Sequence, residues 1–421
     1  MSIANCEISL SKLCRAICSL GAIQAAQIFL PLFALPYLAR VLGQTDFGVL
    51  LFMLTAATFY CLCLEWGFSL WGTRKIAHVR SQTAYHTQIF IAVLTGKCLL
   101  ILLGAGALCV LLPYLPYAEA KALHVAAYAY GAMWALNPVW FLQGRGEGLG
   151  RLARWDVLGN GLVLLALPVL IHDATDTFLY LVLLCTEKTV CSVGISVCLI
   201  RQYGWGFTTL FGACRAGYHA LLAARIFFLS RLAAILSAQG LTFMLAWFLS
   251  PAALGLLVSA EKIARAGVSV AHPVTQALFP EICALQEKQQ QGRILRYSLI
   301  GTLTIASLLA LSLALAAPVL VPVVFGKGYE AVIPMLRIYC LYIPILACNF
   351  MLGIQVLIPF GLEKSMTLVQ GITACCALPC AALLTGLYGI AGAVWIAFLI
   401  ESLICIGYLL CIRRYCPRAF C

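Results

Sequence analysis

Long apolar runs separated by short polar segments dominate the chain. An α-helix crosses the ~30 Å hydrocarbon core of a bilayer with roughly 20 residues, and twelve runs reach about that length. They lie at residues 16–39, 47–71, 88–113, 121–142, 152–171, 177–200, 225–248, 252–280, 297–323, 331–358, 365–385 and 388–412. The pattern therefore predicts an all-α polytopic membrane protein of about twelve transmembrane helices.

The composition agrees with this prediction. Hydrophobic residues make up 63% of the 421 residues and charged residues only 10%, whereas soluble domains carry about 25% charged residues. No polar stretch is long enough for a sizeable catalytic domain outside the membrane. The 21 cysteines form no C-x-x-C pair and lie mostly in apolar runs, where a cysteine packs as a small hydrophobic residue. The sequence therefore predicts no metal site, disulfide framework or other cofactor.

The net charge of +12 is explained by membrane topology and does not indicate nucleic-acid binding. With both termini in the cytoplasm, eighteen lysines and arginines fall in the inside segments, and the outside loops hold only Arg40, Lys121 and Lys327. Cytoplasmic loops of membrane proteins carry such an excess of basic residues. We therefore expect both termini in the cytoplasm and no nucleic-acid partner.

The spans are expected to form two six-helix lobes around a central cleft. The longest connection, residues 201–224, carries aromatic residues between basic ones, which is typical of an amphipathic segment lying at the membrane interface. It separates a predicted amino-terminal lobe at 1–200 from a predicted carboxy-terminal lobe at 225–421.

Two short similarities suggest that the lobes are repeats. Gly48-Val49-Leu50-Leu51 resembles Gly255-Leu256-Leu257-Val258, and the segment 143–147 resembles 360–363. Six spans return the chain to its starting side, so the repeat would be parallel, as in some transporters whose binding site lies between the halves. Chance similarity between apolar segments is the alternative.

Charged side chains within the apolar runs are the candidate functional residues, because ionisable groups inside a membrane are costly and mark substrate or ion pathways. The basic candidates are Lys97, Arg231, Lys262, Arg265 and Arg337, with Arg40 at the outer mouth of the first span. They can line a wet, basic cleft for an anionic substrate. Lys97 lies too deep in its run to snorkel easily. Snorkelling to the interface is the alternative for Arg231, and anchoring of the helix is the alternative for Arg40. Lys188 can reach a neighbouring helix and its role is left open, and Asp156 is expected to be an interface residue rather than a proton carrier.

Acidic residues in the spans are the candidates for ion coupling. Glu401 lies in the middle of the last span and is the first candidate, followed by Glu261 and Glu65. Glu261 and Arg265 are four residues apart and can form a structural ion pair, while Lys262 is turned about 100° away on the same helix and can face the cleft. An interhelical hydrogen bond is the alternative role for Glu401.

Three sequence blocks resemble a known family: Pro36–Gly43 with Phe47-Gly48, Pro138–Gly144 with Glu147, and Ser259–Ile263 with Gln276–Pro280. In this order they resemble Wzx-type polysaccharide flippases of the multidrug/oligosaccharidyl-lipid/polysaccharide exporter superfamily. The resemblance implies a bacterial inner-membrane protein that moves an undecaprenyl-pyrophosphate-linked oligosaccharide from the cytoplasmic to the periplasmic leaflet. It implies alternating access coupled to H⁺ or Na⁺. Expected partners are this substrate, membrane lipids, and the polysaccharide polymerase and chain-length machinery.

Other functions fit the sequence less well. A multidrug exporter of the same superfamily would be expected to carry an acid in the first span, yet none lies between Glu7 and Asp46. A peptidoglycan-precursor flippase would have more than twelve helices. A membrane enzyme such as a polysaccharide polymerase would have a large periplasmic loop, and neither His124 nor His272 has an acidic partner nearby in the sequence. The sequence therefore favours a transporter over an enzyme.

Overall fold

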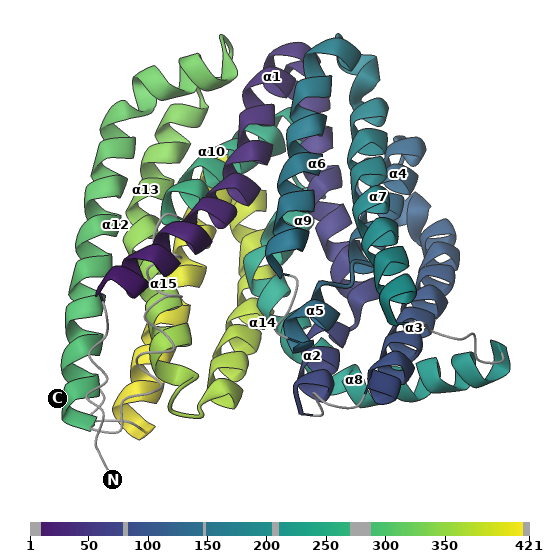
Figure 1. Ribbon diagram of the computed structural model, residues 1–421. Helices are drawn as coiled ribbons and strands as arrows, with labels where there is room; N and C mark the ends of the chain where they lie inside the picture. The colour runs from purple at the N-terminus through teal and green to yellow at the C-terminus, as the bar shows by residue number, and fades with distance from the viewer. Residues whose placement is uncertain (1–9, 79–82, 146–148, 204–209, 270–287, 416–421) are drawn as a thin grey trace. The chain divides into compact units, whose positions relative to one another are not determined.

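The computed structural model describes residues 10–78, 83–145, 149–203, 210–269 and 288–415 (Figure 1). Within these ranges the regular structure is helical and no β-strand occurs. Seven described helical segments are long and apolar enough to cross a membrane: Leu32–Glu65, Tyr85–Tyr114, Ala174–Gln202, Leu295–Phe325, Val332–Leu357, Glu363–Tyr388 and Ile390–Tyr415. The predicted all-α polytopic membrane protein is confirmed.

The helices follow the predicted runs in order. The first helices are α1 (Leu10–Glu65), α2 (Phe68–His78), α3 (Thr83–Leu111), η1 (Leu112–Tyr114), α4 (Lys121–Ala135), α5 (Val139–Arg145), α6 (Leu149–Leu170), η2 (Ala174–Asp176) and α7 (Thr177–Tyr203). They are followed by α8 (Leu210–Ala238), α9 (Gly240–Leu245), α10 (Pro251–Ser269), α12 (Lys288–Phe325), α13 (Val332–Phe350), the π-helix η3 (Met351–Leu357), α14 (Glu363–Tyr388) and α15 (Ile390–Tyr415).

Helix breaks explain where the observed elements differ from the runs. The run 16–39 and most of the run 47–71 fall on α1, and the end of the second run reaches α2. The backbone of α1 leaves the helical region at Gly43 with a φ of 73°, a conformation that glycine adopts without steric cost. The run 121–142 is divided between α4 and α5. The end of the run 252–280 lies outside the described residues, as do Glu147 and the block Gln276–Pro280.

A short polar turn separates α6 from α7. The Asp173 side chain accepts hydrogen bonds from the hydroxyl and the amide of Thr175, and Asp176 reciprocates to form a capping box. The hydrogen bond from the Thr175 hydroxyl, together with that from its amide, holds the pKa of Asp173 below its ordinary value. The carboxylates satisfy amides that a helix start leaves unpaired.

The chain divides into two compact units, Ala34–Gly255 and Met1–Phe33 with Leu256–Cys421. In the first unit α2, α3, α5 and α8 share a core in which Phe90 stacks on Trp140 and meets Phe141 edge-on. In the second unit α13 packs against α12 and α15, and α14 packs against α15. The predicted linker 201–224 includes the end of α7 and the start of α8, and the predicted lobes 1–200 and 225–421 stay a prediction.

Several helices carry a stripe of exposed apolar side chains. On α6 this stripe is made of Leu158, Leu162, Leu165 and Val169, each more than half exposed. The spacing of three and four residues places them on one helix face. Apolar surface of this extent is suited to lipid rather than to water, so these faces are assigned to the hydrocarbon of the bilayer.

Two glycines of the predicted repeat touch each other. A Cβ atom added to Gly255 would lie 2.8 Å from the Cα atom of Gly48, and a Cβ atom added to Gly48 would collide with the carbonyl oxygen of Pro251. All three residues belong to the unit Ala34–Gly255. The backbones approach this closely because neither glycine has a side chain. The equivalence of the two segments as repeats stays a prediction.

We predict that Gly48→Ala destabilises the protein by about 1–3 kcal/mol, because the added methyl group must push two closely packed backbones apart. Gly106→Ala is the matched control. It lies within α3 and has open space around its Cβ position, so alanine should be neutral or slightly stabilising through its better helix propensity. Thermal unfolding of both purified variants in detergent measures the difference, and equal midpoints would contradict the close approach.

Candidate functional site

The first group of buried charges lies where α1 ends. Trp66 and Gly67 adopt positive φ values of 52° and 74°, which turn the chain into α2. The carboxylate of Glu65 accepts hydrogen bonds from the amides of Gly67 and Ser69, so it supplies acceptors that the start of α2 needs. Its Oε2 atom also lies 3.8 Å from Nε of Arg231 in α8.

Trp66 fixes this joint to α8. Its indole nitrogen donates to the carbonyl oxygen of Leu221 at 3.0 Å, and its ring stacks on Phe228 with a centroid distance of 4.1 Å. A positive φ is unfavourable for a bulky residue, so these contacts hold a conformation that the isolated chain would avoid. These contacts between Trp66 and α8 place Arg231 beside Glu65.

Lys97 is buried in the same unit, with 1% of its surface exposed. Its ammonium donates to the carbonyl oxygen of Ala135 at 2.5 Å, at the last residue of α4. The final carbonyls of a helix lack intrahelical partners and carry partial negative charge, so the position suits a cation. Glu65 and Cys61 also interact with Lys97 electrostatically. Lys97, which the sequence places too deep to snorkel easily, therefore has a hydrogen-bond acceptor inside the protein.

The second group lies in the other unit, where α10, α13 and α15 contribute charged and polar side chains. Nε of Arg265 lies 2.6 Å from Oε1 of Glu261, which is the predicted pair. Glu401 accepts a hydrogen bond of 2.8 Å from the amide of Asn349, the interhelical contact given above as an alternative. Arg265 also interacts electrostatically with Tyr342 and Glu401. The cation is thus shared by carboxylates of two helices.

The remaining predicted basic residues are Lys262, Arg40 and Arg337. Lys262 is half-buried and interacts electrostatically with Glu261 and Arg265. Arg40 of α1 and Arg337 of α13 are exposed. The structure thus brings Glu65, Lys97 and Arg231 together in one unit. It brings Glu261, Lys262, Arg265 and Glu401 together in the other.

Sequence reasoning missed a third group, between α6 and α7. Nζ of Lys188 lies 3.2 Å from Oδ1 of Asp156 and 3.1 Å from Oε2 of Glu187. The sulfur atom of Cys191 lies 3.5 Å from Oε1 of Glu187. The signal available was the i,i+4 spacing of Glu187 and Cys191, which places both on one helix face. The contact with α6 has no counterpart in the sequence.

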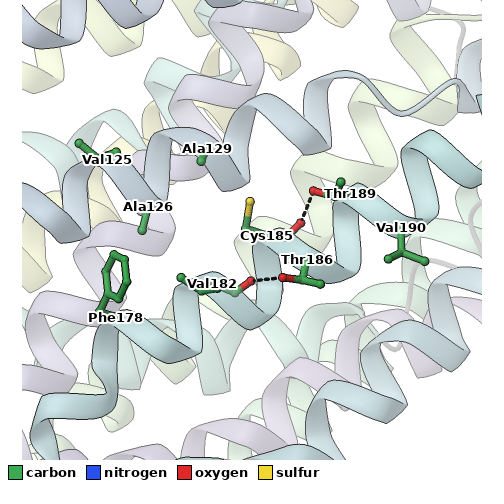
Figure 2. A pocket seen from close by; sticks show the side chains of 9 residues that line it. All are labelled: Val125, Ala126, Ala129, Phe178, Val182, Cys185, Thr186, Thr189 and Val190. Carbon is green, nitrogen blue, oxygen red and sulfur yellow. Dashed lines mark hydrogen bonds between the residues drawn. The ribbon is translucent and has the colours of Figure 1, made fainter.

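A pocket of about 340 Å³ lies between α4 and α7 (Figure 2). Its lining is largely apolar and includes Val125, Phe178 and Val182. The hydroxyls of Thr186 and Thr189 donate to carbonyl oxygens of their own helix at 2.8 and 2.7 Å. This pocket therefore suits hydrocarbon and offers no cation to an anionic head group.

The chain matches the polysaccharide biosynthesis protein family over residues 13–286. The match covers well over half of the 421 residues, and the chain belongs to this family. The resemblance drawn from the three sequence blocks is confirmed at this level.

Two curated relatives cover most of the chain, and both are described as candidate O-antigen transporters. One, from Escherichia coli (strain K12), is 25% identical over 84% of this chain and 85% of its own length. The other, from Shigella dysenteriae, is 24% identical over 91% of this chain and 95% of its own length.

Solved structures share the fold. A lipid II flippase MurJ in an inward closed conformation has a TM-score of 0.73 at 9% identity, over 97% of this chain and 88% of that chain. A mutant of the Vibrio cholerae MATE transporter VcmN has a TM-score of 0.60 at 16% identity, over 97% of this chain and 99% of that chain. The relatives and these structures are described as transporters or flippases, which agrees with the predicted transporter and not with a membrane enzyme.

We predict that Glu65→Ala destabilises the unit more than Glu65→Gln. Alanine removes both the acceptors for α2 and the charge facing Arg231, whereas glutamine keeps one acceptor oxygen and loses only the charge. Loss of a helix cap costs about 1 kcal/mol, and an ion pair with a partly exposed partner contributes less. Thermal unfolding in detergent compares the two variants. Equal losses of stability would show that Glu65 acts through its charge alone.

Proposed function

We propose that this protein is a flippase for a lipid-linked oligosaccharide, moving an undecaprenyl-pyrophosphate-linked O-antigen or polysaccharide repeat unit across the bacterial inner membrane. Transport runs from the cytoplasmic to the periplasmic leaflet by alternating access, with both termini in the cytoplasm. The family membership, the names of the two relatives and the fold shared with a lipid II flippase support this proposal.

The observation that carries the proposal is an arginine within an apolar helix whose side chain is only partly buried. Arg265 lies inside the predicted span 252–280 and retains 37% side-chain exposure although it pairs with Glu261. Hydrocarbon cannot solvate the charge of a half-buried arginine, so the accessible part of this side chain needs water or an anion beside it. A pyrophosphate head group supplies such an anion, and the planar donors of arginine suit phosphate oxygens.

The remaining basic candidates belong to the proposal as well. We assign Lys97, Arg231, Lys262 and Arg337 to the passage of the head group, and Arg40 to its release on the outer side. A sugar pyrophosphate is large and anionic, so it cannot cross hydrocarbon unaided. Polymerase and chain-length proteins are the proposed partners, because they consume the product on the periplasmic leaflet.

The ion-coupling residues of the proposal are Glu401, Glu261 and Glu65. Glu401 and Glu261 both interact with Arg265, so a proton or Na⁺ that neutralises either carboxylate changes how strongly the guanidinium is held. A freed guanidinium can then bind phosphate. This competition links ion binding to substrate binding through one side chain.

Deletion of the gene tests the proposal. Cells without the protein should still assemble lipid-linked repeat units, but these should stay in the cytoplasmic leaflet and surface polysaccharide should be lost. Leaflet-specific labelling of the glycan measures the distribution, and plasmid-borne protein restores it. Normal surface polysaccharide in a strain without another flippase would overturn the function. Dye efflux by the same strains separates the proposal from a multidrug exporter.

Lys97→Ala and Lys262→Ala should each weaken export at least about tenfold (about 1.4 kcal/mol per factor of ten). Each substitution removes a positive charge that stabilises an anionic head group within the membrane. Lys364→Ala, which changes an exposed lysine at the start of α14, is the matched control. Surface glycan is normalised to the amount of protein in the membrane, so a folding defect is detected separately. Export at the control level in both variants would remove these lysines from the site.

A further inference from the structure

The charge cluster between α6 and α7 lies deep within α7. Glu187 is ten residues beyond the start of α7 at Thr177, or about 15 Å along the axis, and only 3% of its side chain is exposed. Asp156 reaches the cluster from α6 with 18% of its side chain exposed. The carboxylate of Glu187 cannot reach the membrane surface from this depth, so it must be stabilised inside the protein.

The packing of α6 leaves a space that the carboxylate of Glu187 fills. A Cβ atom added to Gly159 would lie 2.8 Å from Oε1 and 2.9 Å from Cγ of Glu187. A methyl group at this position would therefore displace the carboxylate. Gly161, two residues further along α6, has open space around its Cβ position. The absence of a side chain at position 159 is thus what admits Glu187 to the cluster.

The ligand atoms of the cluster are close enough to share one cation. Carboxylate oxygens of Asp156 and Glu187 and the sulfur of Cys191 lie within 4.8 Å of one another. Lys188 already places its ammonium 3.2 and 3.1 Å from the two carboxylates, so a metal ion would have to displace it. A proton needs no such space. When Asp156, Glu187 and Lys188 are all ionised, these three groups together carry one net negative charge, which is costly in an apolar interior, and one proton on a carboxylate removes it.

The titratable groups that face Glu187 come from three helices. Asp156 belongs to α6, Tyr130 to α4, and Lys188 and Cys191 to its own helix. Oε1 of Glu187 accepts from Lys188 and Cys191. Oε2 lies near the ammonium but accepts no well-directed hydrogen bond from the described part of the chain. This oxygen is therefore the atom at which a proton can be held.

We propose that Asp156, Glu187 and Lys188 form a proton-binding site in which Glu187 takes up one exchangeable proton while the ammonium of Lys188 stays paired with Asp156. The site is separate from the carboxylates around Arg265. It goes beyond the proposed function, because proton binding here requires no substrate and can be measured on the resting protein. In a transporter such a site can take up a proton on one side of the membrane and release it on the other.

Infrared difference spectroscopy of the purified full-length protein in lipid nanodiscs tests the proposal. Spectra at acidic and basic pH should show the carbonyl band of a buried protonated carboxyl group. Glu187→Gln should remove the intensity of one such group, and Glu187→Asp should restore a shifted band. An unchanged band in Glu187→Gln overturns the site. A response to Na⁺ at constant pH, without a response to pH, also overturns it in favour of a metal cation.

Gly159→Ala gives a second test that leaves every titratable group in place. The methyl group should displace the Glu187 carboxylate and abolish or shift its protonated-carboxyl band, while Gly161→Ala should leave the band as in the unchanged protein. Near-equal spectra of the two glycine variants would contradict the arrangement. Melting curves identify a variant that fails to fold, and Glu187→Gln then carries the test. Failure of the flippase function would appear in leaflet labelling and leave these spectra unaffected.

Discussion

Charge buried in apolar helices is the constraint on which this structure depends. A charged side chain deep in a bilayer needs a partner within the protein, because hydrocarbon supplies none. Three different solutions occur in the described residues. Lys97 uses the carbonyl at the end of α4, Arg265 uses Glu261 one turn away on its own helix, and Lys188 joins Asp156 of α6 to Glu187. Each solution fixes the position of a helix as well as a charge.

Buried polar contacts also determine how the ends of the helices pack. Glu65 caps α2 and faces Arg231, while Trp66 holds α8 through an indole hydrogen bond and a stacked ring. In an apolar environment, van der Waals packing alone discriminates poorly between neighbouring registers. A buried polar contact has a large cost when it is broken. These contacts therefore select one register for α1, α2 and α8.

Contacts within one helix were predictable from the sequence, whereas the partners in contacts between helices were not. The spacing of Glu261 and Arg265 predicted their pair, and the apolar runs predicted the order of the helices. The sequence places Lys97 too deep to snorkel easily, yet nothing in it points to the carbonyl of Ala135. The cluster of Asp156 with Lys188 also requires the rotation and height of two helices. Those quantities depend on packing at glycines such as Gly159.

The fold does not determine the substrate, because a lipid II flippase and multidrug transporters share it with this chain. The sign of the accessible charge discriminates better. An organic cation requires an unpaired acid, whereas an anionic head group requires a cation that can leave its carboxylate. Under the proposed function Arg265 meets the second requirement, since its side chain is half-buried and interacts with both Glu261 and Glu401. Under the proposed function, neutralising either acid would weaken its hold on the guanidinium, so the coupling ion and the phosphate would act on the same side chain.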